Sequence, residues 1–244
     1  MDWLIVLVVG LLAGTLGGIV GFGTSIMLLP LLVVMFGPLE AVPIMAVTAL
    51  MANFSRVMVW WREVDWKVCG VYSLTGIPCA ALGAHTLLQL DSRIIEMALG
   101  IFFLLMIPLR RRLQSGGMKV RLWHMAPVGA VIGFLTGIVV STGPINTPFF
   151  LGYGLVKGAY LSTEAMASLG VYASKALVFR QFGALSWDIL WKGLIIGSSV
   201  MAGSAFAKRF VLRMDAAQFR LLMDGIILLA GLSMLATAIF PQTP

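Results

Sequence analysis

The chain has 244 residues, of which 60% are hydrophobic and 11% are charged, and its formal net charge at pH 7 is +7. Together with a mean hydropathy of +1.00, this composition excludes an ordinary soluble domain and predicts an all-α polytopic membrane protein whose surroundings are the lipid bilayer. The positive charge indicates no nucleic-acid partner, because the basic residues lie at the ends of apolar segments and not along one soluble face.

Eight hydrophobic segments follow one another along the chain. A basic stretch at 110–124 separates them into two sets of four, and the five cations in its first twelve residues predict that it is cytoplasmic. The sequence therefore predicts a first transmembrane repeat at 1–109, a linker at 110–124 and a second transmembrane repeat at 125–244. The segments are Leu4–Phe36, Ala41–Trp61, Val68–Leu90, Ile94–Leu109, Met125–Leu151, Thr163–Phe182, Ile189–Leu212 and Gln218–Phe240.

The two halves of the chain resemble each other in sequence. Gly18-Ile19-Val20 leads to Pro30 in the first half, and Gly137-Ile138-Val139 leads to Pro148 about 118 residues later. Val64-Asp65-Trp66 aligns in the same way with Leu185-Ser186-Trp187. Because the offset drifts only from 118 to 125 over the whole half, we interpret the halves as a tandem duplication.

The first segment of each repeat is interrupted by glycine, proline and hydroxyl residues. A broken helix inside a membrane is tolerated where its free backbone groups are buried in protein or line a cavity. Paired interruptions in the two halves of a membrane chain therefore indicate a transport site. Leu4–Phe36 has 33 residues, and as one helix it would extend about 50 Å against a hydrocarbon core of about 30 Å. Each first segment is thus either one tilted, broken crossing or a re-entrant hairpin.

The distribution of Lys and Arg favours the hairpin. Without the four cations that lie inside segments, eight full crossings place 8 cations on the cytoplasmic side and 5 outside. Six crossings plus two hairpins place 11 inside and 2 outside, which obeys the positive-inside rule better. This arrangement leaves three crossings per half, so the repeats would be inverted, as is common in secondary transporters. Eight full crossings remain the alternative.

Polar residues gather at both interruptions and recur inside later segments. Free backbone N–H groups beside the interrupting glycines are suited to bind an anion. The neighbouring hydroxyls can satisfy the broken backbone and line a polar cavity at the same time. Lys175 lies deep in its segment and is the expected substrate cation, whereas Arg56 is near enough to a segment end to extend to the interface. The candidate substrate-binding residues are Gly21, Gly23, Thr24, Ser25, Asn53, Arg56, Ser141, Thr142, Gly143, Asn146, Thr147 and Lys175.

Other residues receive a structural interpretation. Gly10 and Gly14, like Gly133 and Gly137, are spaced by four, which predicts close approach of helix backbones. Asp224, the deepest carboxylate considered, has Arg220 one turn before it, which favours a local ion pair over a proton relay. The histidines have no metal-ligand neighbour and the chain has no P-loop, so we expect no metal, no cofactor and no enzymatic activity.

The half-motifs, the size and the duplicated four-segment plan resemble the TauE/SafE family of sulfite exporters, also called the TSUP family. The residues that carry the resemblance run from Gly17 through Gly23 to Pro30-Leu31, and from Gly133 through Gly137 and Ser141-Thr142-Gly143 to Pro148. The resemblance implies a bacterial inner-membrane carrier for small sulfur-containing oxyanions, namely sulfite, sulfonates such as sulfoacetate, or thiosulfate. Thr24 and Ser25 stand where the family usually has consecutive glycines, which suggests an altered selectivity.

We therefore expect a secondary transporter that binds a small anion between the two glycine-rich segments. Export is favoured, because an anion leaving a negative-inside cell gains about 2.3 kcal/mol per charge per 100 mV. An anion channel and a non-transporting membrane subunit are the alternatives. The sequence leaves the anion, the direction of net flux, the coupling ion and the formation of a homodimer open.

Overall fold

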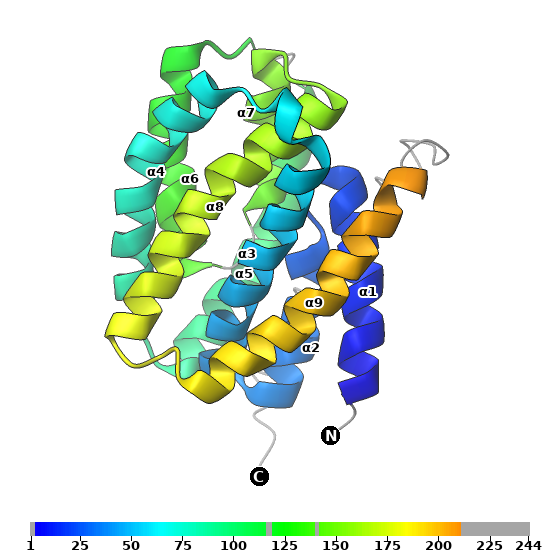
Figure 1. The fold of residues 1–244 in the computed structure, drawn as a ribbon. Helices are drawn as coiled ribbons and strands as arrows, with labels where there is room; N and C mark the ends of the chain where they lie inside the picture. The colour runs from blue at the N-terminus through cyan, green and yellow to red at the C-terminus, as the bar shows by residue number, and fades with distance from the viewer. Residues whose placement is uncertain (1–2, 116–118, 140–141, 211–244) are drawn as a thin grey trace.

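The computed structural model describes residues 3–115, 119–139 and 142–210, and every regular element within these ranges is a helix (Figure 1). The predicted segment Gln218–Phe240 and the candidate Ser141 lie outside the described residues. The α-helices are α1 (Trp3–Val20), α2 (Thr24–Phe36), α3 (Pro38–Trp60), α4 (Trp66–Leu87), α5 (Ser92–Ser115), α6 (Met125–Ile138), α7 (Gly143–Tyr153), α8 (Lys157–Gln181) and α9 (Trp187–Phe210), with short 3-10 helices at Trp61–Glu63 and Leu122–His124.

Four helices within the described residues are long and apolar enough to cross a membrane. Large apolar side chains such as Leu4 and Leu74 are exposed on the outer surface of the bundle, where lipid can cover them. These features confirm the predicted all-helical membrane class, whereas the division into eight repeated segments stays a prediction. The four candidate spans are Trp3–Val20, Pro38–Glu63, Trp66–Leu87 and Trp187–Ala207.

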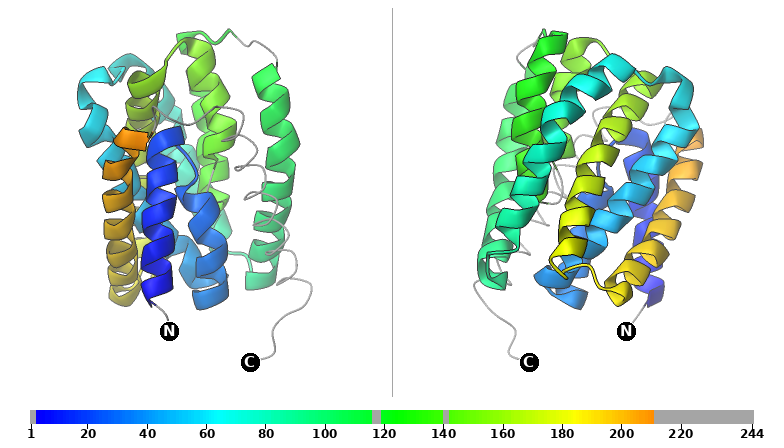
Figure 2. Two further views of the ribbon diagram at one scale, coloured as in Figure 1. Left: turned by 90° about the vertical axis from the view of Figure 1, so that its right-hand side faces the viewer. Right: turned by 60° about the vertical axis from the view of Figure 1, so that its left-hand side comes forward.

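The first interrupted segment folds as a helical hairpin, in which α2 returns beside α1. The chain turns at Gly21 and Gly23, whose φ angles of 88° and 128° are rarely adopted by residues with a side chain. At the open end, the rings of Trp3 and Phe36 pack with their centroids 6.0 Å apart. The start of α1 and the end of α2 therefore lie at the same end of the molecule (Figure 2).

The second interrupted segment folds in the same way from α6 and α7. The backbone N–H of Val120, just before α6, donates to the carbonyl of Gly152 near the end of α7, at 3.0 Å. Figure 1 places α7 at the upper end of the molecule, opposite the chain's N-terminus. The two hairpin tips meet, because a Cβ added to Gly143 would overlap the Cβ of Phe22. Both interruptions of the sequence are thus brought together inside the bundle.

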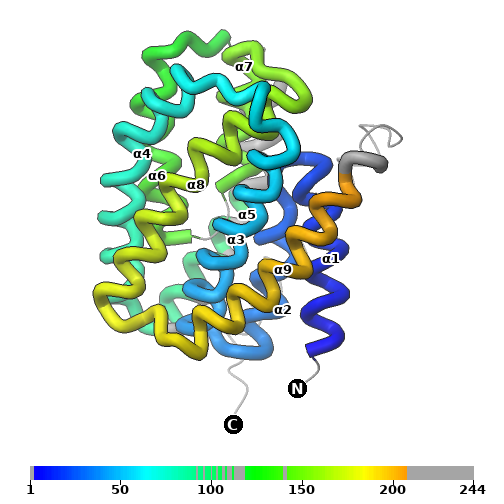
Figure 3. The backbone as a smooth tube through the Cα atoms, in the orientation of Figure 1, coloured from blue at the N-terminus to red at the C-terminus, as the bar shows by residue number. Residues whose placement is uncertain are grey.

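Helices from the two halves pack against each other. α1 lies along α9 and α6 lies along α4, while α3 and α8 pack together (Figure 3). A Cβ on Gly14 would overlap the carbonyl of Val200, and a Cβ on Gly133 would overlap the carbonyl of Gly76. The predicted close packing at glycines spaced by four is therefore confirmed at these helix pairs.

A helix extends into the stretch that the sequence analysis predicts as the linker. α5 continues through Ser115, so residues 110–115 of the predicted 110–124 linker are helical. The extension is understandable, because the Arg, Leu and Gln residues of this stretch are good helix formers whatever their charge. The end of an apolar run therefore does not coincide with the end of the helix that contains it.

Candidate functional site

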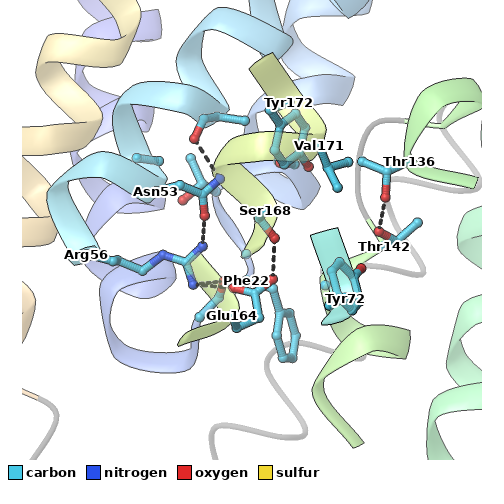
Figure 4. A pocket seen from close by; sticks show the side chains of 17 residues that line it. Phe22, Asn53, Arg56, Tyr72, Thr136, Thr142, Glu164, Ser168, Val171 and Tyr172 are labelled. Carbon is cyan, nitrogen blue, oxygen red and sulfur yellow. Dashed lines mark hydrogen bonds and ion pairs between the residues drawn. The ribbon is translucent and has the colours of Figure 1, made fainter. Parts of the chain in front are cut away.

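A pocket lies between the two hairpin tips, and residues of α3, α4 and α8 complete its lining (Figure 4). Most of the candidates predicted from the sequence contribute to its walls, and they come from both interruptions and from α3. The lining residues are Gly21, Phe22, Gly23, Thr24, Ser25, Ala49, Ala52, Asn53, Arg56, Tyr72, Thr136, Thr142, Gly143, Glu164, Ser168, Val171 and Tyr172.

One ion pair dominates the electrostatics of the pocket. Arg56 Nη1 lies 2.9 Å from Glu164 Oε2, and the two side chains are only 9% and 5% exposed. The Arg56 guanidinium also donates to the carbonyl of Gly21 and to Oδ1 of Asn53. Ser168 Oγ donates to the other carboxylate oxygen at 2.9 Å. Several partners are needed, because both ions lose water when they are buried. The pair links the first hairpin tip, α3 and α8.

Two helices begin at this pocket. Thr24 is the first residue of α2 and Gly143 is the first residue of α7, and no side chain caps either N-terminus. The first N–H groups of a helix have no partner within the helix, and its dipole is positive at this end. The N-termini of α2 and α7 therefore add two positive dipole ends to the guanidinium of Arg56, a combination suited to an anion.

The hydroxyl groups of the two tips partly satisfy the broken backbone. Thr24 Oγ1 donates to the carbonyl of Ala13 at 3.2 Å, so this hydroxyl joins α2 to α1. Across the second break, the hydroxyls of Thr136 and Thr142 lie 2.5 Å apart. Thr24, Thr136 and Thr142 also line the pocket. The two roles expected from the sequence, backbone satisfaction and cavity lining, therefore occur in the same side chains.

Asn146 and Thr147 lie behind the pocket wall. Asn146 Nδ2 is 3.4 Å from Glu164 Oε1, and the Thr147 hydroxyl is 2.6 Å from that of Tyr160. Both candidates are buried and contact groups around the ion pair, although neither lines the pocket itself.

Lys175 differs most from its predicted place. The side chain is fully buried, does not line the pocket, and donates from Nζ to the carbonyls of Thr136 at 2.8 Å and Val139 at 3.3 Å. These carbonyls belong to the end of α6, where the helix breaks and its dipole is negative. The sequence analysis overlooked this partner, because it considered a ligand or a counter-charge for Lys175 and not the free carbonyls of the break.

Glu164 is the functional candidate that the sequence analysis missed. The sequence analysis considered Asp224 instead, and this residue lies outside the described residues. A signal was nevertheless present, because a buried cation such as Arg56 needs a counter-charge and Glu164 is an acidic residue inside the apolar segment Thr163–Phe182. Tyr72 and Tyr172, which complete the wall, carried no comparable signal.

The polar groups of the pocket are a guanidinium, amides, hydroxyls and one carboxylate. Most of them donate hydrogen bonds, so the pocket suits an anion better than a metal ion. No cluster of three or more His, Cys, Asp and Glu suited to a metal occurs in the described ranges.

Comparisons with known proteins agree on one family. Residues 6–234 match the family model described as "Sulfite exporter TauE/SafE". The chain is similar to the "Probable membrane transporter protein YjnA" of Bacillus subtilis (strain 168), with 25% identity over 255 residues that cover 94% of this chain and 98% of that protein. No solved structure matches the chain. The family match includes the tips of both hairpins and all the helices that line the pocket.

Proposed function

Because the chain belongs to the TauE/SafE family of membrane transporters, we propose that it exports a small sulfur-containing oxyanion across the bacterial inner membrane by secondary transport. The candidate substrates are sulfite, a sulfonate such as sulfoacetate, and thiosulfate. The observation that carries the proposal is the position of the buried Arg56 guanidinium in one pocket with the N-termini of α2 and α7.

The pocket offers replacements for the water that a small oxyanion loses on binding. The first backbone N–H groups of α2 and the N–H of Gly143 at the start of α7 act as donors, and so do the hydroxyls of Thr24, Ser25 and Thr142. The next residue of α7 is Pro144, which has no N–H. Arg56 supplies the compensating charge in a planar group that binds sulfonate-type oxygens through two parallel hydrogen bonds. In this proposal Lys175 does not contact the substrate but holds the end of α6, whose last turn forms part of the wall.

We further propose that the two hairpins are re-entrant and that the two halves are inverted repeats that move around the pocket. Two corresponding helix starts support this repeat. The Asp65 side chain accepts hydrogen bonds from Lys67 N and Val68 N where α4 begins, and Ser186 Oγ accepts one from Ile189 N where α9 begins. The end of the molecule that carries the basic linker is placed in the cytoplasm.

A ligand screen on purified protein tests the proposal. Thermal unfolding in detergent is compared in the presence of sulfite, sulfoacetate, thiosulfate, sulfate and acetate, each at equal ionic strength. We expect at least one of the sulfur oxyanions to raise the unfolding temperature more than acetate does, because binding to the folded state stabilises it. No stabilisation by any sulfur oxyanion would contradict the proposal.

Counterflow in proteoliposomes then identifies the kind of transport. Saturable exchange of the stabilising anion, lost in Arg56→Gln, supports a carrier. Arg62→Gln is the matched control, because Arg62 is exposed beside Trp61 outside the pocket. A non-saturating current would identify an anion channel, and an absence of flux would identify a non-transporting subunit.

A further inference from the structure

Glu164 is already paired with Arg56, the cation in this pocket that an anion would bind. Its carboxylate accepts hydrogen bonds from Arg56 and Ser168 and lies 3.4 Å from Asn146 Nδ2. In the proposed function, Arg56 is also the group that supplies the charge for a small oxyanion. The guanidinium of Arg56 is thus already paired with an internal carboxylate, and this ion pair is electrically neutral.

A substrate anion at Arg56 changes this balance. Two negative groups then face one guanidinium within a buried site, and a carboxylate that loses its ionic partner away from water is strongly destabilised. The carboxyl group can remain in the pocket at low cost only if it becomes neutral. Binding of one proton achieves this.

Asn146 offers the acceptor that a neutral carboxyl group requires. The residue is 2% exposed, and its Oδ1 atom has no hydrogen-bond partner among the described residues. A half-turn of the amide exchanges Oδ1 with Nδ2, which already lies beside Glu164. The same side chain can therefore donate to the ionised carboxylate and accept from the protonated acid.

Among the described residues, the other groups facing Glu164 do not compete for this proton. Arg56 from α3 remains charged, and the phenols and the thiol are already protonated at neutral pH. The titratable groups in question are Tyr72 and Cys69 from α4 and Tyr160 and Tyr172 from α8.

We propose that Glu164 couples anion binding to proton uptake. The anion displaces the carboxylate from Arg56, and Glu164 takes up one proton from the same side. On the opposite side the anion leaves, Glu164 releases the proton, and the Arg56–Glu164 pair reforms. One anion and one proton thus bind and leave together. This inference rests on the proposed function, and it adds the coupling ion.

The pH dependence of binding tests the coupling directly. Dissociation constants of the full-length protein are measured for thiosulfate and for methanesulfonate, whose charges do not change over the physiological pH range. In the wild type we expect each constant to rise about tenfold per pH unit wherever Glu164 is ionised in the free protein, because each anion then binds together with one proton. In Glu164→Gln, which keeps an oxygen for Arg56 but cannot titrate, we expect a change of less than about twofold over the same range.

Proton movement gives a second readout. In proteoliposomes loaded with a pH-sensitive dye, a thiosulfate gradient should move protons in the direction of the anion through the wild-type protein. Glu164→Gln should retain thiosulfate exchange and lose the proton signal. Glu40→Gln is the matched control, because Glu40 is paired with Lys192 outside the pocket, and it should behave like the wild type.

The outcomes separate the inference from the proposed function. Retention of the pH slope or of proton movement in Glu164→Gln would overturn the coupling and leave anion transport standing. A wild-type dissociation constant that does not change with pH would also overturn the coupling, whether or not Glu164→Gln folds. Failure of both probes and of sulfite and sulfoacetate to bind the wild type, or full binding by Arg56→Gln, would overturn the proposed function and the coupling with it.

Discussion

At the scale of single residues, Arg56 combines charge with shape. Its guanidinium reaches Gly21, Asn53 and Glu164 at once, which joins three elements around the pocket. Arg56→Lys keeps the charge but not the planar set of donors. We expect an anion affinity at least about tenfold weaker, equivalent to about 1.4 kcal/mol, measured by titration in detergent. An unchanged affinity would show that charge alone is recognised.

Lys175 has a different task from Arg56, and its replacement should separate stability from binding. Lys175→Met leaves the carbonyls of Thr136 and Val139 without this donor, which costs about 1–3 kcal/mol for each buried group left unpaired. We expect a lower unfolding temperature, with Lys175→Arg as the conservative control. Reduced anion affinity at unchanged stability would instead make Lys175 a substrate cation, as the sequence first indicated.

The site was predictable where the local sequence carries the information. Gly21, Gly23 and Thr142 were found because glycine and hydroxyl residues interrupt an apolar segment, which has a local physical meaning. Glu164 was overlooked because its meaning depends on Arg56, which lies 108 positions away in the sequence. The partner of Lys175 depends in the same way on where α6 ends in space.

At the scale of helices, close packing depends on residues without a side chain. Gly133 of α6 lies against the backbone of Gly76 in α4, which cannot move aside as a flexible side chain could. We expect Gly133→Leu to destabilise the protein by at least about 2 kcal/mol, measured as a lower unfolding temperature in detergent. Gly70→Ala is the matched control, because nothing lies within 4 Å of a Cβ there, and helix propensity predicts a gain of up to about 1 kcal/mol. Equal effects of the two substitutions would contradict the packing argument.

The helix breaks could be predicted from the sequence, and the distribution of Lys and Arg favoured a chain that returns over one that crosses. Gly21 and Gly23 marked the first turn correctly, because a positive φ favours glycine. Hydropathy is the same for a chain that crosses and for one that returns. Hydropathy alone therefore does not reveal the return of α2, which the structure shows through tertiary contacts such as that of Trp3 with Phe36.

At the scale of the whole molecule, membrane topology can be tested by labelling. Single cysteines replace Leu4, Leu39 and Arg62 in a variant without Cys69 and Cys79, and react with a membrane-impermeant maleimide. The hairpin predicts that Leu4→Cys and Leu39→Cys react from the periplasmic side and Arg62→Cys from the cytoplasmic side. Eight full crossings predict opposite sides for positions 4 and 39, so their labelling from opposite sides would exclude the re-entrant hairpin.

Proton coupling also determines how the membrane potential acts on the protein. A dianion that leaves with one proton carries one net negative charge, for which 100 mV supplies about 2.3 kcal/mol. A monoanion that leaves with one proton carries no net charge. We therefore expect thiosulfate flux, and not methanesulfonate flux, to respond to a potassium diffusion potential in proteoliposomes. An equal response of both anions would contradict a fixed one-proton stoichiometry.

The membrane class of the molecule was predictable from its composition, and its family was predictable from the two glycine-rich motifs, because neither depends on which helices pack together. The neighbours of each helix were not, since the pairing of α1 with α9 and of α6 with α4 joins surfaces from opposite halves. Hydropathy carries no information about which apolar surfaces meet.

The contact between Phe22 and Gly143 has a mechanical consequence. Because one hairpin arrives from each end of the bundle, the pocket is covered toward each end by a different piece of chain. In the proposed transport cycle, retraction of one cover would admit solutes from one compartment, while the other cover would still block leakage into the second. The two hairpins would then act as separate gates, one toward each compartment, that do not open at the same time.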